Sequence, residues 1–472
     1  MRVLFLGTRI CLFIAGFHFF PEKVKKMIDT IVAISTGAPG GIGIVRLSGK
    51  DAWSIGQRLL SWQGKPQARH MYFSKILSQD GKPIDECLFV LMRGPNSFTG
   101  EDILELHCHG GTVVLTRVLD RCLEAGATLA SPGEFTQRAF LNGRLDLTQA
   151  EAINDLIHAK TQRAASVAVE QLEGSLSRKI KDLRERLLDL LAQIEGRLDF
   201  PDEIQDELPP ELWAELSGIQ AEIGELIRSG HSGQILREGL PVSIAGKPNV
   251  GKSSLLNALL GTERAIVTAC PGTTRDVIQE TANFHGIPVL LADTAGIRQA
   301  HDPAEQLGVE LAQRTAQEAA LVLLVLDGSQ TLADEDHTLL ASFPPEKLLL
   351  VVNKCDLPTA ISAQELGELS PSPAYFVSAQ SGQGLEELIA AIAQRAMLGD
   401  GTNQALLVNA RQREALYGAQ SALQQAYEAQ ELPWDLVAID LRTAVEKLGE
   451  ITGENLVEGL LERIFSNFCL GK

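Results

Sequence analysis

The chain has 472 residues, of which 45% are apolar and 22% are charged, and its formal net charge is −18. That length predicts two to four domains, each large enough for a core of its own. The acidic balance argues against a general nucleic-acid coat protein, which would be basic overall, although it leaves room for a local basic site or a basic partner. Seven cysteines without a CxxC pair indicate a reducing compartment, so we expect a cytoplasmic protein.

Residues 1–27 differ in composition from the rest of the chain. The apolar run from Ile10 to Phe20 follows two arginines and superficially resembles the hydrophobic part of a signal peptide. No small-residue cleavage site follows it, and the run is too short to span a bilayer. We therefore expect an N-terminal extension of a cytoplasmic chain without a membrane partner, and Met1 and Met27 both remain candidates for its cellular start.

Residues 28–143 alternate strand-like runs with turn residues. The runs are TIVAIS, GIGIVRLS, ECLFVLM and DILELHCHG, and they predict a separate α+β domain. The last run contains His107, Cys108 and His109, but no second cluster of ligands lies at the spacing of a zinc site. We therefore expect no metal ion there.

Helical periodicity appears on both sides of the middle of the chain. Apolar residues recur at three- and four-residue steps from Leu183 to Leu198, and again from Val437 to Leu448. The two runs predict one all-α helical domain, made of residues 144–238 and 398–472, with residues 239–397 inserted between them. A simple succession of domains along the chain is the alternative.

The inserted segment contains a phosphate-binding motif. GKPNVGKSS, from Gly246 to Ser254, fits G-x-x-x-x-G-K-[ST], and the flanking PVSIA and SSLLNALLG predict a strand before it and a helix after it. In such a loop the backbone N–H groups surround the phosphates, Lys252 reaches the β- and γ-phosphate oxygens, and Ser253 holds Mg²⁺.

Four further strand-like runs follow in the order found in GTPases. PVLLADTAG places Asp293 where a carboxylate positions the metal ion, and LVLLVLD is the next strand. LLLVVNKCD ends in an NKxD motif, in which Asp356 accepts hydrogen bonds from N1–H and N2–H₂ of guanine, and YFVSAQ supplies a loop that backs the base. The series predicts an α/β Ras-like P-loop GTPase domain. The residues expected to contact GTP are Asn249, Val250, Gly251, Lys252, Ser253, Ser254, Thr268, Ala269, Cys270, Pro271, Gly272, Thr273, Thr274, Asp293, Thr294, Ala295, Gly296, Asn353, Lys354, Cys355, Asp356, Ser378, Ala379 and Gln380.

The groups that cleave GTP are less obvious from these motifs. Many small GTPases carry a water-orienting glutamine directly after DTAG, but here that position is Ile297. The acidic stretch of residues 302–310 is a source of another such group, Thr274 is the expected switch threonine for Mg²⁺, and Arg275 is a candidate for stabilising charge. Asn249 in the P-loop offers an amide oxygen that could hold a monovalent cation where other GTPases use an arginine finger.

Six further motifs are spread over residues 28–472, namely GGIGIVRLSG, PNSFTGEDILELHCHGG, SPGEFTQRAFLNGRLDLTQAEAI, LREG, PGTTRD and FCLGK. Together they resemble the MnmE (TrmE) family of bacterial and organellar tRNA-modification GTPases, and several are specific to that family. The resemblance implies a homodimer in which residues 28–143 form an α+β folate-binding and dimerisation domain, followed by the discontinuous helical domain and the inserted G domain.

The resemblance also implies a reaction that the GTPase loops alone do not reveal. Members of the family work with the flavoprotein MnmG, in a heterotetrameric or larger complex, on certain tRNAs. Together they add aminomethyl or carboxymethylaminomethyl groups to C5 of the wobble uridine. The one-carbon unit comes from a tetrahydrofolate derivative, such as 5-formyl- or 5,10-methylenetetrahydrofolate.

By matched motif, the resemblance assigns folate contacts to Arg46, Glu105, Arg144 and Lys472. The family commonly has a lysine where this chain has Arg144, so the charge of that contact is kept while its geometry can differ.

The resemblance further implies that K⁺ bridges two G domains and activates the GTPase. The matching ligands are Asn249, Thr268, the backbone carbonyl of Cys270, and Thr273. Glu305 matches the glutamate with which the family orients water, which would explain why Ile297 can replace the usual glutamine.

The FCLGK end matches the family's C-terminal motif, which the helical domain presents towards the modification centre. The match implies a chemical or modification-linked role for Cys469. A well-packed helix end fits the spacing of Ile464, Phe465 and Phe468 equally well.

Two other functions compete with this interpretation. A ribosome-assembly GTPase would share the G motifs, but it usually carries a basic RNA-binding domain, and neither the acidic balance nor FCLGK favours it. A nucleotide-gated scaffold would bind GTP only to switch partners. Lys252, Ser253, Thr274 and Glu305 favour hydrolysis over that second alternative.

Overall fold

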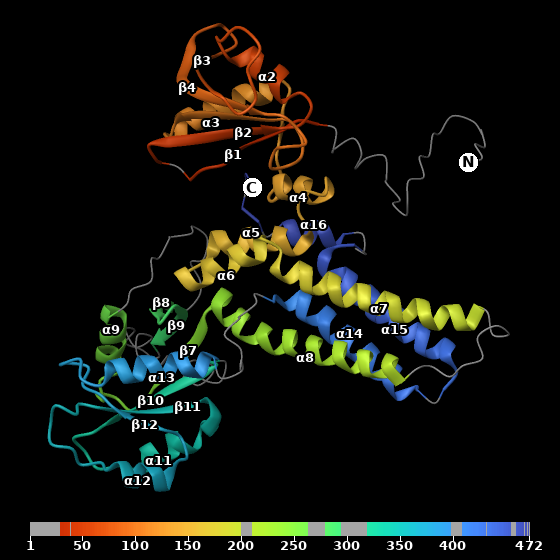
Figure 1. Cartoon of the computed structure of the whole chain (residues 1–472). Helices are drawn as coiled ribbons and strands as arrows, with labels where there is room; N and C mark the ends of the chain where they lie inside the picture. The colour runs from red at the N-terminus through yellow and green to blue at the C-terminus, as the bar shows by residue number, and fades with distance from the viewer. Residues whose placement is uncertain are drawn as a thin grey trace, which may run out of the picture. The chain divides into compact units, whose positions relative to one another are not determined.

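The computed structural model describes residues 29–37, 39–199, 210–262, 279–293, 319–397, 408–430, 432–454, 459–466, 468–469 and 471. The described residues divide into two compact units, here called unit 1 (the described residues within 1–150 and 456–472) and unit 2 (the described residues within 151–455). Most of their helices and strands are labelled in Figure 1. This division joins the C-terminal segment to the N-terminal residues, and the predicted domain borders stay a prediction.

A six-stranded mixed sheet forms the centre of unit 1. Its strand order is β3-β4-β5-β2-β1-β6, and neighbouring strands are antiparallel except for β1 and β6. Val45 and Leu47 of β2 lie opposite Leu106 and Leu104 of β5, and all four are buried because alternate residues of a strand share a face. The strands are β1 Ile31–Ile34, β2 Ile42–Ser48, β3 Met71–Leu77, β4 Pro83–Met92, β5 Ile103–His109 and β6 Thr128–Leu129.

Helices cover both faces of this sheet. Ile55 of α2 and Leu115 of α3 belong to the same hydrophobic core as Val45, whereas Phe135 of α4 packs with Ile31 and Ala33 on the opposite face of β1. The predicted α+β arrangement of this segment is confirmed. The helices of the unit are α2 Ala52–Leu59, α3 Thr112–Glu124, α4 Glu134–Leu141 and α16 Leu460–Phe465.

A helical bundle makes up one part of unit 2. Leu183 and Leu187 of α7 share one hydrophobic core with Val437 and Leu441 of α15, so the two predicted helical runs bury their apolar faces together. The helices are α6 Gln162–Leu172, α7 Ser175–Asp199, α8 Pro210–Glu238, α14 Ala410–Glu428 and α15 Trp434–Thr452, and α5 Leu147–His158 crosses the division between the units. None of the described helices is both long and apolar enough to cross a bilayer.

A second six-stranded sheet forms the other part of unit 2. Its order is β12-β11-β10-β7-β9-β8, and every neighbouring pair is parallel except β8 and β9. The strands are β7 Leu240–Ala245, β8 Gln279–Phe284, β9 Ile287–Asp293, β10 Leu321–Asp327, β11 Leu348–Asn353 and β12 Ala374–Phe376. The accompanying helices are α9 Lys252–Thr262, α11 Asp334–Ala341, α12 Ala363–Leu369 and α13 Leu385–Met397, with a short 3₁₀ helix at Pro345–Lys347.

The topology of the second sheet brings the GTPase motifs to one edge. All residues of β10 and β11 are buried, as expected of central parallel strands. The carboxyl ends of parallel strands meet at the same edge, and there the chain continues into the P-loop after β7 and into the NKCD segment after β11. Ligands of open α/β sheets bind at this edge.

Candidate functional site

The P-loop is shaped by close approaches that its sequence permits. Gly251 has φ +98°, and a Cβ atom there would lie 2.3 Å from the side-chain nitrogen of Asn353, so no other residue fits without displacement. Lys252 begins α9, and its ammonium donates hydrogen bonds to the carbonyls of Gly246 (2.8 Å) and Lys247 (2.6 Å). The loop thus combines a helix N-terminus with the positively charged ammonium of Lys252, and both favour the binding of phosphate.

Asn353 joins three loops that are distant in sequence. Its buried side chain donates to the carbonyl of Val250 in the P-loop (3.0 Å) and accepts a hydrogen bond from the backbone N–H of Ala379 (3.0 Å). Cys355 N–H donates to the carbonyl of Val377 (3.1 Å), which ties the NKCD segment to the SA loop a second time. The structure therefore brings the P-loop, the NKCD segment and the SA loop together.

Lys354 connects the NKCD segment to a residue that the sequence analysis missed. Its ammonium donates to the carbonyl of Asn249 (3.0 Å) and pairs with Asp327 (2.5 Å), the last residue of β10. Burial opposes ionisation of Asp327, but hydrogen bonds from Lys354 and Ser329 outweigh it and hold the pKa of the carboxyl below its usual value. The acidic end of LVLLVLD was the available signal for this residue.

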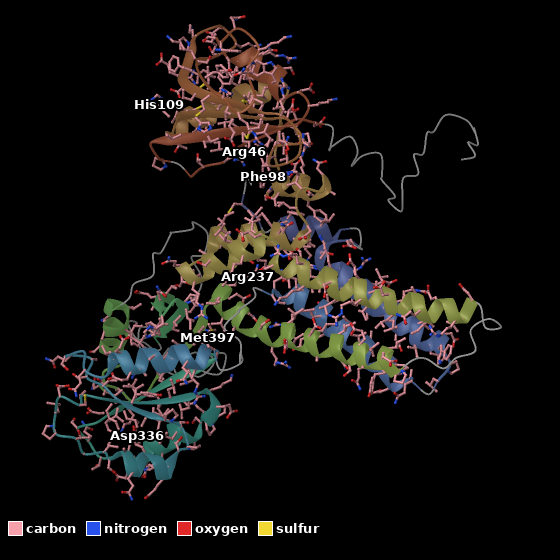
Figure 2. The ribbon with its side chains drawn as sticks, viewed as in Figure 1. Arg46, Phe98, His109, Arg237, Asp336 and Met397 are labelled. Carbon is pink, nitrogen blue, oxygen red and sulfur yellow. The ribbon has the colours of Figure 1, made fainter. Side chains whose placement is uncertain are left out.

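A small cavity of about 100 Å³ lies beside the P-loop. Lys247 donates to Asp336 (2.6 Å), which also accepts the backbone N–H of Ala333 at the start of α11. Asp336 is labelled in Figure 2. This ion pair attaches Lys247 of the P-loop to α11, the helix that follows β10. The cavity lining includes Lys247, Asn249, Asp327, Asp336 and Lys354.

The remaining predicted GTP contacts divide into two groups. Ser253 and Ser254 lie exposed in the first turn of α9, and Asp293 ends β9. Asp356 is exposed after β11, and in the SA loop Ser378 is buried while Gln380 is exposed. The others lie outside the described residues. These are Thr268, Ala269, Cys270, Pro271, Gly272, Thr273, Thr274, Thr294, Ala295 and Gly296. The candidate catalytic residues Arg275 and Glu305 also lie outside the described residues.

In unit 1 the predicted folate residues Arg46 and Glu105 are cross-strand neighbours. The guanidinium donates from Nε to Glu105 Oε1 (2.9 Å), and a second nitrogen lies 2.8 Å from the same oxygen. His107 Nε2 lies 3.2 Å from the other carboxylate oxygen. The Arg46 guanidinium also lies 6.0 Å from the ring centre of Phe98 and 5.8 Å from that of Phe135 (Arg46 and Phe98 are labelled in Figure 2). This charged pair is therefore bordered by two aromatic rings.

Arg144 approaches the same region through the loop that carries Phe98. Its Nε donates to the carbonyl of Ser97 (3.1 Å), and nearby Asn142 donates to the carbonyl of Thr99 (2.7 Å). Lys472, the fourth predicted folate residue, lies outside the described residues.

Strand alternation separates the members of the His-Cys-His run. His107 pairs with Glu105, and His109 pairs with Asp85 (2.7 Å), while Cys108 points into the core on the other face. Burial raises the pKa of the Cys108 thiol well above its usual value. Among the described residues, no group of three or more His, Cys, Asp or Glu side chains could hold a metal ion.

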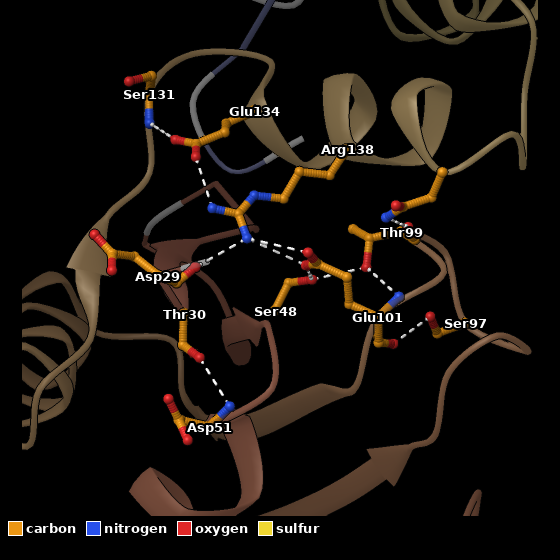
Figure 3. A network of polar contacts seen from close by, with 11 residues as sticks. Asp29, Thr30, Ser48, Asp51, Ser97, Thr99, Glu101, Ser131, Glu134 and Arg138 are labelled. Atoms are coloured by element: carbon orange, nitrogen blue, oxygen red, sulfur yellow. Dashed lines mark hydrogen bonds and ion pairs between the residues drawn. The ribbon is translucent and has the colours of Figure 1, made fainter. Parts of the chain in front are cut away.

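A buried polar network, also missed from the sequence, centres on Arg138 (Figure 3). Its guanidinium, 3% exposed, donates to Glu134 (3.0 Å), Glu101 (3.2 Å) and the backbone carbonyl of Asp29 (2.9 Å). Ser48 donates to the same Glu101 (2.7 Å). The network links the start of α4 to the loop of residues 97–101.

The C-terminal segment packs within unit 1. Phe465 and Phe468 are buried against Leu147 and Ala150, as the packed-helix-end interpretation expected, while the side chain of Cys469 is exposed. The segment thus combines an apolar anchor with an accessible thiol.

Comparison with known proteins finds relatives along nearly the whole chain. A family model described as the MnmE helical domain matches residues 147–469, and one described as the GTP-binding protein TrmE N-terminus matches residues 30–144. The tRNA modification GTPase MnmE of Symbiobacterium thermophilum is 47% identical over 455 residues, with 94% of this chain and 99% of that protein covered. The protein of the same name from Synechococcus sp. (strain JA-3-3Ab) is 46% identical over 462 residues, with 96% and 100% covered.

A solved structure matches only a third of the chain. The G domain of the T. maritima FeoB iron transporter is 29% identical and covers 33% of this chain and 98% of that one. Its TM-score of 0.26 is too low for a comparison of folds.

Proposed function

The chain belongs to the MnmE family of tRNA modification GTPases, and on that premise we propose that it is a K⁺-activated GTP hydrolase that acts with the flavoprotein MnmG. The pair would install aminomethyl or carboxymethylaminomethyl groups at C5 of the wobble uridine of certain tRNAs. The one-carbon unit would come from 5-formyl- or 5,10-methylenetetrahydrofolate. A cytoplasmic homodimer is part of the proposal, because a cation shared between two G domains requires two chains.

The position of Asn353 is the observation that supports the proposal of GTP binding. It hydrogen-bonds both the P-loop at Val250 and the SA loop at Ala379, so the phosphate-binding and base-binding segments are held at one edge of the sheet. Asp356, three residues later, is exposed at the same edge and has the two acceptor oxygens that guanine N1–H and N2–H₂ require.

The donor types at this edge fit hard cations. Ser253 offers a hydroxyl oxygen in the first turn of α9, which suits Mg²⁺ together with Thr274. Asn249 offers an amide oxygen from the P-loop, where its backbone has φ +65° and its carbonyl accepts a hydrogen bond from Lys354. We assign it to K⁺ with Thr268, the Cys270 carbonyl and Thr273. Bound there, the cations would supply positive charge against the phosphates.

The chain's own residues would complete hydrolysis. Lys252 would exchange its hydrogen bonds with the P-loop carbonyls for bonds to phosphate oxygens. Glu305 would orient the attacking water and accept its proton, and Arg275 would stabilise the charge that develops on the leaving oxygens.

The region around Arg46 and Glu105 has chemistry suited to a reduced folate. The carboxylate can accept the N–H groups of a pterin, while Arg46, Arg144 and Lys472 suit the glutamate tail. Phe98 and Phe135 add aromatic surface beside Arg46. Bound there, the folate would supply the one-carbon unit that Cys469 would help to transfer.

Single-turnover GTP cleavage in K⁺ and in Na⁺ tests the proposal. We expect faster cleavage in K⁺, and we expect Asn249→Ala to abolish the difference while GTP still binds in a fluorescent-nucleotide assay. Equal rates of the wild-type protein in the two salts at saturating GTP would refute K⁺ activation. Two other results together would favour the ribosome-assembly alternative. The protein would co-sediment with ribosomal subunits, and cells lacking the gene would show unaltered wobble uridine.

A further inference from the structure

Two hydrogen bonds hold the C-terminal segment, one at Cys469 and one two residues beyond it. The backbone N–H of Gly133 donates to the carbonyl of Cys469 itself (3.4 Å), and the Ser35 hydroxyl donates to the carbonyl of Gly471 (3.0 Å). Gly133 belongs to residues 131–134, here called the α4 turn, and Ser35 directly follows β1. The backbone around the thiol is therefore attached at two separate points of unit 1.

At each of the two contacts one partner has to be a glycine, Gly133 at the first and Gly471 at the second. A Cβ atom on Gly133 would lie 2.6 Å from the carbonyl oxygen of Phe465 and 2.9 Å from Cβ of Phe468. A Cβ atom on Gly471 would lie 2.3 Å from the carbonyl oxygen of Ile34. Gly133 and Gly471 also have φ angles of +68° and +88°, which residues with side chains rarely adopt.

Apolar packing fixes the segment just before the thiol. The rings of Phe465 and Phe468 lie 5.1 Å apart, and these side chains are only 2% and 7% exposed. Burying two aromatic side chains stabilises the position of this segment, because each removes a large apolar surface from water. An exposed cysteine directly after such an anchor has much less freedom than a chain end that frays.

The α4 turn itself is held by the buried network of Figure 3. Glu134 accepts the backbone N–H of Ser131 (2.8 Å) through one oxygen and the Arg138 guanidinium (3.0 Å) through the other. Arg138 in turn pairs with Glu101 (3.2 Å). The carboxylate that closes the turn is itself paired with a buried guanidinium, and such a satisfied buried network restricts the conformational freedom of the turn.

The same turn touches the candidate folate region. Phe135 follows the α4 turn directly and is fully buried, and the Arg46 guanidinium lies 5.8 Å from the centre of its ring. Gly133 and Phe135 are two residues apart, so the contact with Cys469 and the contact with Arg46 arise from one short segment.

We propose that Gly133, Ser35 and Gly471 are positioning residues, which dock the C-terminal segment so that the α4 turn holds Cys469 while supporting Arg46. The docking stands on the contacts above. Its consequence for tRNA modification rests on the proposed function, and the two are measured separately.

Hydrogen exchange of the full-length protein tests the docking. In Gly133→Ala and Gly471→Ala, we expect the amides of a peptide covering residues 463–472 to exchange about tenfold faster than in the wild type. Gly143→Ala is a matched control, because Gly143 also has φ +68° but a Cβ atom there meets nothing within 4 Å. Exchange in both test variants equal to that of Gly143→Ala would overturn the docking.

Activity measurements test what the docking does. We expect Gly133→Ala and Gly471→Ala to lower wobble-uridine modification with MnmG by about tenfold or more, while GTP hydrolysis stays at the wild-type rate. Ser35→Ala removes one hydrogen bond without backbone strain, so we expect it to show the same pattern more weakly. It keeps the test decisive even where Gly133→Ala fails to fold. Faster exchange with unchanged modification would overturn the positioning role. If the wild-type protein modified no tRNA, the proposed function would fail, while the exchange result would still decide the docking.

Discussion

Asp356 offers the sharpest single-residue test of nucleotide choice. In Asp356→Asn one acceptor oxygen becomes an N–H₂ donor, which faces the donors of guanine and instead suits the extra carbonyl of xanthine. Each lost hydrogen bond to a charged group is worth about 1.5–3 kcal/mol, so we expect GTP affinity to fall by tenfold or more and xanthosine triphosphate affinity to rise. Competition binding with the two nucleotides measures the shift.

Asp334→Asn is a suitable control, since Asp334 begins α11 outside the NKCD segment. It should leave the preference for GTP intact. Unchanged GTP affinity in Asp356→Asn would mean that this carboxylate does not read the base.

At the scale of residues, the sequence predicted contiguous motifs better than contacts. Lys252, Ser253 and Asp356 could be assigned because a P-loop and an NKxD motif are local patterns with fixed spacing. The bond from Asn353 to Val250 spans about a hundred positions, and the Arg138 network joins residues from four separate segments. Such contacts follow from the packing of elements, which local periodicity does not encode.

At the scale of elements, the buried carboxylate of Asp155 in α5 pairs with the partly exposed guanidinium of Arg237 in α8 at 2.7 Å, and we expect this pair to make stability depend on pH. Burial, only partly offset by the Arg237 charge, raises the pKa of Asp155 to about 6. The folded state therefore binds this proton more tightly than the unfolded state does. Its stabilising contribution is complete below the unfolded pKa of about 3.9 and is lost as pH rises through 6.

Asp155→Asn should remove this dependence. Between pH 4 and pH 7, we expect the unfolding free energy of the wild type to fall relative to the variant by about 1–3 kcal/mol, measured by urea denaturation. Asp182→Asn, at a side chain that is 67% exposed, should track the wild type across the same range. A constant difference between wild type and Asp155→Asn at all pH values would contradict the raised pKa.

Periodicity predicted the helices well, because α7 and α15 each bury one regular apolar stripe in the same core. It could not predict where the C-terminal segment packs. The helix α16 has only six residues, and its partners Leu147 and Ala150 lie more than three hundred positions earlier. A short element of this kind is placed by its tertiary contacts rather than by its own pattern.

At the scale of the whole molecule, the two proposed chemistries belong to different compact units. The described GTPase motifs lie in unit 2, whereas Arg46, Glu105, Arg144 and Cys469 lie in unit 1. A change confined to the tail should therefore affect modification without affecting nucleotide cleavage, provided that the protein stays folded.

Cys469→Ser is the direct test of that separation. Serine keeps the size of the side chain, and Cys469 is exposed while Phe465 and Phe468 supply the packing, so the folded state should be retained. A hydroxyl is a far weaker nucleophile than a thiol at neutral pH, because almost none of it is ionised. We expect K⁺-stimulated GTP hydrolysis at the wild-type rate, together with unmodified wobble uridine when the variant is assayed with MnmG, folate and tRNA. Wild-type modification by this variant would reduce Cys469 to an exposed residue after a packed helix end, and the one-carbon transfer would then have to depend on the Arg46 and Glu105 region without it.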